Sequence, residues 1–193
     1  MQSSKLLKLI ILALMGTIST VLMLLDFPLP LLPAFLKVDF SDIPALIAAL
    51  LFTPVAGIAV EGIKNLLHLI FTGFVDPVGA FANFFAGMLF VVPVALFYHR
   101  MKGVKSLVSG LITGTIALTL GMGVFNYFIL LPIYSAYAGF EQLALPAARW
   151  SMILIGITPF NILKGIIVSM LFIPLFVKLR PWLEKKRMSL SKA

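Results

Sequence analysis

The chain has 193 residues, of which 61% are hydrophobic and only 11% charged, and its mean hydropathy is +1.12. These values exclude an ordinary soluble globular domain and predict an all-α protein that crosses a membrane several times. Cysteine is absent, which excludes thiol catalysis, disulfides and cysteine-ligated metal sites. The net charge of +8 resides at the ends of apolar segments, so we expect a lipid bilayer and no nucleic acid as its partner.

The first apolar segment, residues 5–25, has no cleavage site after it and predicts an uncleaved span rather than a signal peptide. Prolines between Asp26 and Pro33 end this span. The following residues, to Phe40, predict a long ordered loop that caps the bundle. Ser41 is the predicted capping residue of the next helix, with Pro44 in its first turn.

Six apolar segments predict one compact membrane domain over residues 1–193, with no second soluble domain. The predicted spans are 5–25, 41–53, 55–72, 77–98, 106–131 and 152–179, with a short helix from Phe140 to Arg149 before the last. Four glycines in the fifth span predict close helix contact.

Lysine and arginine placement predicts that both termini are cytoplasmic, because basic residues gather on the inner side of membranes. Eleven of the 15 basic residues fall on one side of a six-span chain: Lys5, Lys8, Arg100, Lys102, Lys105, Lys178, Arg180, Lys185, Lys186, Arg187 and Lys192. The other side has Lys37 and Arg149 among five acids: Asp26, Asp39, Asp42, Asp76 and Glu141.

Polar residues inside the predicted spans share one layer in the outer half of the membrane. At about 1.5 Å per residue, Asn126 lies roughly 8 Å deep, Asn83 roughly 9 Å, Asn161 roughly 13 Å and Lys164 roughly 18 Å. The third span adds Glu61, Lys64, Asn65 and His68. The inner half is almost free of ionisable residues, which predicts a pocket open only to the outside rather than a channel.

Two interpretations of these residues remain open. Glu61 and Lys64 are three residues apart on one helix and could simply neutralise each other, and His68 suits an interfacial position. For Asn126, Asn161 and Lys164 we expect ligand contact, because no intramembrane acid lies at the depth of Lys164; Glu61 is the one rival partner. A lone intramembrane histidine favours no metal site.

Four stretches resemble the riboflavin-specific substrate-binding (S) components of energy-coupling factor (ECF) transporters. They are residues 27–46 (FPLPLLPAFLKVDFSDIPAL), 60–65 (VEGIKN), 125–126 (FN) and 159–164 (PFNILK). The resemblance implies a six-helix protein of a prokaryotic plasma membrane that is not an enzyme and has no cofactor. It implies riboflavin as the transported substrate, in an outward-facing pocket closed by the first loop.

The resemblance also implies residue roles and partners. Riboflavin contacts are expected from Asn126, Asn161 and Lys164, from the loop residues Leu36, Lys37, Val38 and Asp39, and from Glu61, Lys64, Asn65 and Asn83 in the same polar layer. The expected partners are a transmembrane coupling subunit and two ATP-binding-cassette ATPase subunits. Docking on the coupling subunit is expected through small residues of the first span: Ala13, Gly16, Thr17 and Thr20.

Other function classes stay open at this point. The alternatives are an S component for another vitamin, or a structural or assembly membrane protein without a small-molecule ligand. No HExxH motif, paired intramembrane aspartates, GxSxG motif or phosphate-binding glycine loop is present, so proteolysis or ATP hydrolysis by this chain is excluded.

Overall fold

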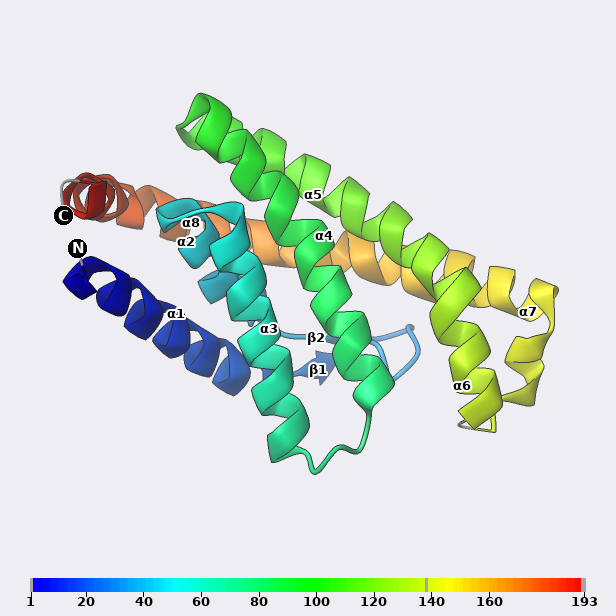
Figure 1. The fold of residues 1–193 in the computed structure, drawn as a ribbon. Coiled ribbons are helices and arrows are strands. Elements are labelled where there is room, and N and C mark those ends of the chain that lie inside the picture. Colours follow the sequence, from blue (N-terminus) through cyan, green and yellow to red (C-terminus); the bar gives the residue numbers. More distant parts are fainter. Residues whose placement is uncertain (1, 138, 192–193) are drawn as a thin grey trace.

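The apolar segments fold into helices, because a chain in lipid must satisfy its backbone polar groups internally. The computed structural model describes residues 2–137 and 139–191. Its elements, shown in Figure 1, are α1 (Gln2–Met23), β1 (Phe27–Pro28), β2 (Lys37–Val38), α2 (Asp42–Leu51), α3 (Pro54–Phe71), α4 (Pro77–Met101), α5 (Val104–Phe125), α6 (Leu131–Tyr137), α7 (Pro146–Ser151) and α8 (Thr158–Ser191). Two π-helical turns, η1 (Asn126–Leu130) and η3 (Met152–Ile157), and a 3₁₀ turn, η2 (Glu141–Ala144), join the last elements.

Within the described residues, five helical stretches are long and apolar enough to cross a membrane. They are Lys5–Met23, Pro54–Phe71, Pro77–Met101, Val104–Ala136 and Pro146–Trp182. The remaining predicted span is represented by α2, which has only 10 residues. At about 1.5 Å per residue it is roughly 15 Å long, half of what a hydrocarbon core requires. Where six spans were predicted, the described residues thus contain five helices of spanning length and one half-length helix.

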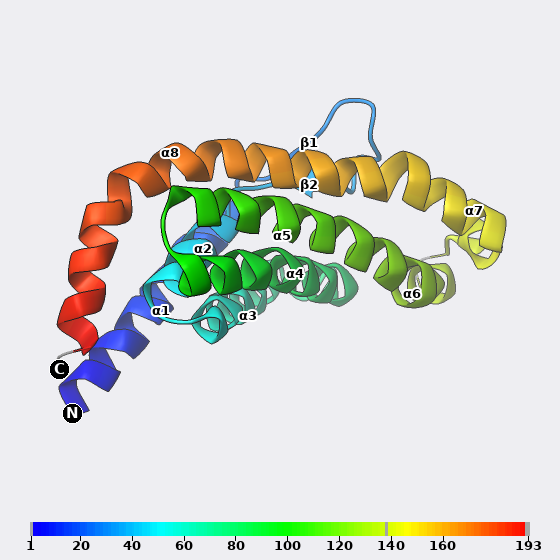
Figure 2. The same cartoon turned by 90° about the horizontal axis from the view of Figure 1, so that it is seen from above.

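The connections alternate between the two ends of the bundle. The start of α1, the α4–α5 turn and the far end of α8 lie at one end, while the α3–α4 turn and the α6–α7 hairpin lie at the other (Figures 1 and 2). This alternation agrees with an even number of crossings. Which end faces the cytoplasm stays a prediction, and Lys192, which contributed to it, lies outside the described residues.

The loop between α1 and α2, called loop 1 here (residues 24–41), is ordered by a short antiparallel hairpin. Phe27 pairs with Val38 and Pro28 with Lys37. The Lys37 ammonium lies 3.0 Å from the Asp26 carboxylate across the base of this hairpin. Val38 is fully buried, so the second strand carries loop 1 into the bundle just before α2 begins.

Helix α2 begins where predicted, but the predicted cap is wrong. The Ser41 side chain makes no capping hydrogen bond. Instead the Asp39 carboxylate accepts a hydrogen bond of 2.7 Å from the Ser41 backbone N–H. This bond closes the turn just before α2 and leaves the first N–H groups of the helix without a side-chain cap.

Three predicted helix ends differ from the structure. The fifth span continues through η1 into α6 to Tyr137, the last span begins at Pro146, and α8 runs on to Ser191. A loop was expected to begin at Pro132, and a basic tail was expected to follow Leu179. Pro132 instead follows the π turn, whose wider hydrogen bonding makes room for the ring, and α8 continues past Pro174 and Pro181 with a bend (Figure 2).

Glycines on α5 let it approach α4 closely. A Cβ atom on Gly114 would lie 2.7 Å from the Phe90 carbonyl oxygen, and one on Gly110 would lie 2.9 Å from the Val94 Cα. The close contact predicted for this span is therefore confirmed at these two positions. It sets α4 and α5 side by side over most of their length (Figure 2).

We expect Gly114→Ala to destabilise the protein by about 1–3 kcal/mol, because backbone atoms of α4 cannot move aside as a side chain could. Gly123→Ala on the same helix is the matched control, since its added Cβ meets only Ile153 Cγ2, at 3.8 Å. Thermal unfolding of both variants in the same detergent is the measurement. Equal midpoints would contradict the packing argument.

Candidate functional site

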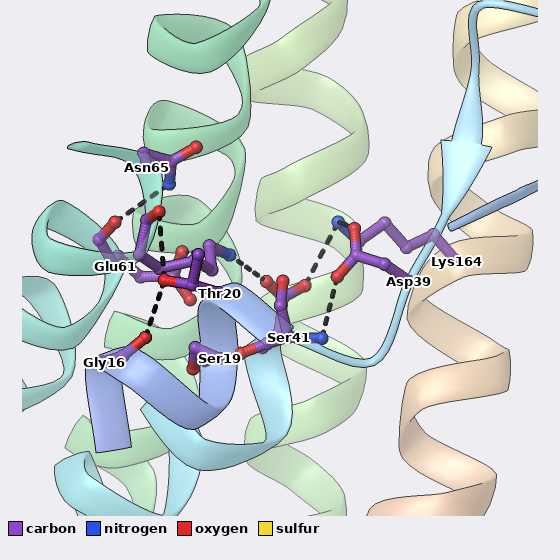
Figure 3. A network of polar contacts seen from close by, with 10 residues as sticks. Gly16, Ser19, Thr20, Asp39, Ser41, Glu61, Asn65 and Lys164 are labelled. Atoms are coloured by element: carbon purple, nitrogen blue, oxygen red, sulfur yellow. Dashed lines mark hydrogen bonds and ion pairs between the residues drawn. The ribbon is translucent and has the colours of Figure 1, made fainter. Parts of the chain in front are cut away.

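Five charged residues meet in the interior of the bundle, where uncompensated charge is strongly disfavoured. Three are acids and two are lysines: Asp39 and Asp42 from loop 1 and α2, Glu61 and Lys64 from α3, and Lys164 from α8. Each is between 0% and 4% exposed. Figure 3 shows Glu61 on one side of this buried charge cluster and Lys164 with Asp39 on the other.

Asp42 is the centre of the buried charge cluster, because each of its oxygens faces a different lysine. Oδ1 lies 2.9 Å from the Lys64 Nζ, and Oδ2 lies 3.2 Å from the Lys164 Nζ. Asp39 Oδ2 is farther from Lys164, at 3.9 Å. The expectation that no acid lies near Lys164 is therefore wrong: the start of α2, expected at the outer surface, lies inside the bundle.

The Glu61–Lys64 pairing, left open by the sequence, forms. Glu61 Oε2 lies 2.5 Å from Lys64 Nζ, so Glu61 is not the partner of Lys164. Room for this carboxylate is made by Gly87 of α4, where any Cβ would overlap Glu61. Neither Glu61 nor Lys64 has any exposed surface. Both are therefore enclosed by protein rather than presented to a ligand.

Asn161 and Lys164 lie one helical turn apart near the start of α8, as predicted from their spacing. Gly165 lets this part of α8 approach α5, since a Cβ there would overlap Thr115. Asn126 is the first residue of the π turn that follows α5. Such turns widen a helix locally and occur frequently at functional sites.

The two asparagines are held in the same way. Asn126 Nδ2 donates a 2.8 Å hydrogen bond to the Met122 carbonyl, and Asn161 Nδ2 donates one of 2.8 Å to the Ile157 carbonyl. Each bond uses one of the two amide N–H groups. Each side chain therefore retains one acceptor oxygen and one donor in a fixed orientation, which suits a ligand edge with alternating donors and acceptors.

Loop 1 contacts the same region. Leu36 packs on a small cluster of Leu131, Ile153 and Ile157, which lie in α6 and η3. Gly156 sits against Pro33, whose ring would be 3.3 Å from an added Cβ. Loop 1 thus packs on α6 and η3, while its role as a cap over a ligand pocket stays a prediction.

The other predicted contact residues are placed differently. Lys37 is exposed in its pair with Asp26, whereas Val38 is buried. On α3, Asn65 Nδ2 bonds the Glu61 carbonyl at 2.9 Å, and its buried oxygen has no partner in the described part of the chain. The Asn83 oxygen on α4 is likewise buried and unpartnered there. Whether any of these four residues contacts a ligand stays a prediction.

Asp42 is the residue that the sequence reasoning missed. It was read as a loop acid at a helix start, where acids are common, and that position gave no sign of burial. A usable signal was the count of charges: two intramembrane lysines with one intramembrane glutamate left one positive charge without a partner. A nearby acid had to fold inward to compensate it.

The four small residues of α1 that were expected to contact a partner do not all lie on one face of the helix. Gly16 packs on Ile63 of α3, and Thr20 is buried, with its hydroxyl donating to the Gly16 carbonyl at 2.9 Å. The prediction is corrected for these two residues, because contacts within the chain occupy them. Ala13 and Thr17 lie on the exposed face of the same helix, among leucines and isoleucines.

Known proteins similar in sequence and structure identify the family of this chain. A family profile described as the substrate-specific component of ECF transporters matches residues 7–176. A solved structure entitled "Structure and mechanism of the S component of a bacterial ECF transporter" superposes with a TM-score of 0.79 at 40% identity, covering 93% of this chain and 98% of that one. The chain belongs to the ECF transporter S components.

Two curated relatives of this S component carry more specific names. The riboflavin transporter FmnP of Bacillus subtilis (strain 168) is 44% identical over 182 residues, 93% of this chain and 95% of that protein. The riboflavin transporter RibU of Staphylococcus aureus (strain TCH60) is 42% identical over 186 residues, 96% of this chain and 95% of that protein. The family consists of transporter subunits, so this S component is not an enzyme.

Proposed function

We propose that this S component captures riboflavin in a pocket open to the outside of a prokaryotic plasma membrane. The pocket is bounded by loop 1, the α5–η1 junction and the start of α8. Riboflavin is the transported substrate and not a cofactor. Two observations support this proposal. Asn126 and Asn161 present oriented amides, and Asn161 lies one helical turn from the Lys164 ammonium. The chain also has relatives that are named riboflavin transporters.

The chemistry of the flavin ring explains why these groups suit it. The pyrimidine edge of isoalloxazine alternates carbonyl acceptors with one N–H donor. An asparagine that has one acceptor and one donor left can pair with an N–H and a neighbouring carbonyl, and a lysine can donate to a carbonyl. The aliphatic side chains of loop 1, with Leu36 foremost, then cover the ring and exclude water. Val38 and Asp39 place the loop for this contact.

Delivery into the cell requires a partner in this proposal. The partners are a transmembrane coupling subunit and two ATP-binding-cassette ATPase subunits. The exposed face of α1 with Ala13 and Thr17 is the docking surface we propose for the coupling subunit, because small residues let two helices approach closely. The chain itself contains no phosphate-binding glycine loop, so the energy comes from those subunits.

Purification in mild detergent tests the ligand. Protein from cells grown with riboflavin is expected to be yellow and to release flavin on denaturation, in up to equimolar amount. An S component for another vitamin, the alternative, would give a colourless preparation from which a different small molecule is extracted. Failure of the stripped protein to quench the fluorescence of added riboflavin would contradict the proposal.

A further inference from the structure

The two buried lysines of this chain differ in how completely the protein surrounds them. Lys64 has two carboxylates within 2.9 Å and no exposed surface. Lys164 has one carboxylate at 3.2 Å and a second only at 3.9 Å, and its side chain is 5% exposed. An ammonium has three N–H donors. The Asp39 carboxylate is too far from Lys164 for a hydrogen bond, and the Lys164 side chain is partly exposed, so Lys164 keeps a donor that a ligand can reach. Lys64 has no exposed surface and contacts only the protein.

Asp42, which lies between the two lysines, fixes the position of the Lys164 side chain. A lysine side chain has four rotatable carbon bonds and costs up to about 2 kcal/mol of rotamer entropy to immobilise. The Asp42 carboxylate, itself 1% exposed, holds the Lys164 ammonium with Oδ2. Its other oxygen is held by Lys64 at 2.9 Å, and Lys64 by Glu61. The ordering of Lys164 is thus completed before any ligand arrives.

The net charge of the buried charge cluster also bears on what Lys164 can bind. The buried charge cluster contains three carboxylates and two ammonium groups. The positive charge of Lys164 is thus already compensated, so the site offers an oriented hydrogen-bond donor rather than a free cation. Such a donor favours a neutral carbonyl over an anionic group as its ligand.

We propose that Asp42 is the positioning residue for Lys164. It orients the Lys164 ammonium towards a carbonyl of the bound ring, and Lys64 and Glu61 hold Asp42 from behind without touching the ligand. This inference rests on the proposed function, because it assumes that Lys164 contacts the flavin. It assigns different roles to Lys64 and Lys164, which were both expected from the sequence to be ligand contacts.

A double-mutant cycle with riboflavin as the probe tests this role. The stripped full-length protein, Asp42→Asn, Lys164→Met and the double variant are titrated with riboflavin, and fluorescence quenching gives the four Kd values. We expect Asp42→Asn to raise Kd at least tenfold in the parent protein and by less than threefold in the Lys164→Met background. Glu141→Gln, an exposed acid outside the cluster, is the matched charge control and should leave Kd within twofold.

The visible absorption band of the bound flavin is a second readout, because its shape reports hydrogen bonding to the ring carbonyls. Asp42→Asn and Lys164→Met should shift it in the same way. The inference is overturned if Asp42→Asn binds like the parent protein, or if it raises Kd by the same factor with and without Lys164. If Asp42→Asn does not fold, Asp42→Glu replaces it, with the same criteria. No riboflavin binding by the parent protein would instead contradict the proposed function.

Discussion

Lys164→Met is expected to raise the Kd for riboflavin by about 10–100-fold, because hydrogen bonds to charged groups contribute about 1.5–3 kcal/mol. Methionine keeps the length and most of the volume of the side chain but has no N–H donor. The carbonyl it leaves unpaired is then buried against loop 1. Titration of the stripped protein with riboflavin, followed by fluorescence quenching, measures the change.

Leu163→Ala is the matched control for this prediction. Leu163 adjoins Lys164 on α8 and is 41% exposed, so its truncation should leave Kd within twofold. Asn161→Ala, one turn away, should weaken binding by about 5–10-fold, as expected for a neutral hydrogen bond of about 1 kcal/mol. A Lys164→Met protein that binds within threefold of the parent would remove Lys164 from the site.

Lys64→Met should lower the free energy of unfolding by about 3–5 kcal/mol, the largest loss of stability we expect from a single substitution here. It leaves the Glu61 carboxylate buried without a counter-charge and Asp42 with only Lys164. Adding Glu61→Gln should restore most of the loss, because the remaining two acids then face one lysine and the buried amide carries no charge. Thermal unfolding in one detergent compares the variants.

Lys37→Met provides the comparison with an exposed ion pair. Lys37 and Asp26 have side chains that are 47% and 32% exposed, so breaking their pair should cost about 0–1 kcal/mol. Two outcomes would show that the buried charge cluster does not stabilise the fold as described. One is an unfolding midpoint of Lys64→Met equal to that of Lys37→Met; the other is a double variant less stable than Lys64→Met alone.

Some features of loop 1 could be predicted from local sequence patterns, and others could not. The proline-rich segment after Asp26 was expected to lie outside a helix, and α1 ends before it, at Met23. The β1–β2 hairpin and the burial of Val38 could not be predicted, because they depend on contacts between segments that are distant in the sequence. The same holds for Asp39, whose carboxylate turns back to the Ser41 N–H.

Two predicted helix ends were placed too early. The helices were expected to end at Leu131 and near Leu179, yet Pro132 and Pro181 both lie inside helical runs. A neighbouring π turn or a bend relieves the clash of the ring with the preceding turn. Whether a helix stops or bends there is decided by the helices packed around it.

The sequence by itself determined the class of the protein. Its apolar segments indicated a membrane protein with several spans, because hydropathy depends on residue type alone. The resemblance of its motifs to a known family then indicated an S component, and the family profile agrees. Only the tertiary structure decided the partners of the charges. Asp42 pairs with both buried lysines because the short helix α2 brings it between α3 and α8, a long-range contact that no sequence periodicity records.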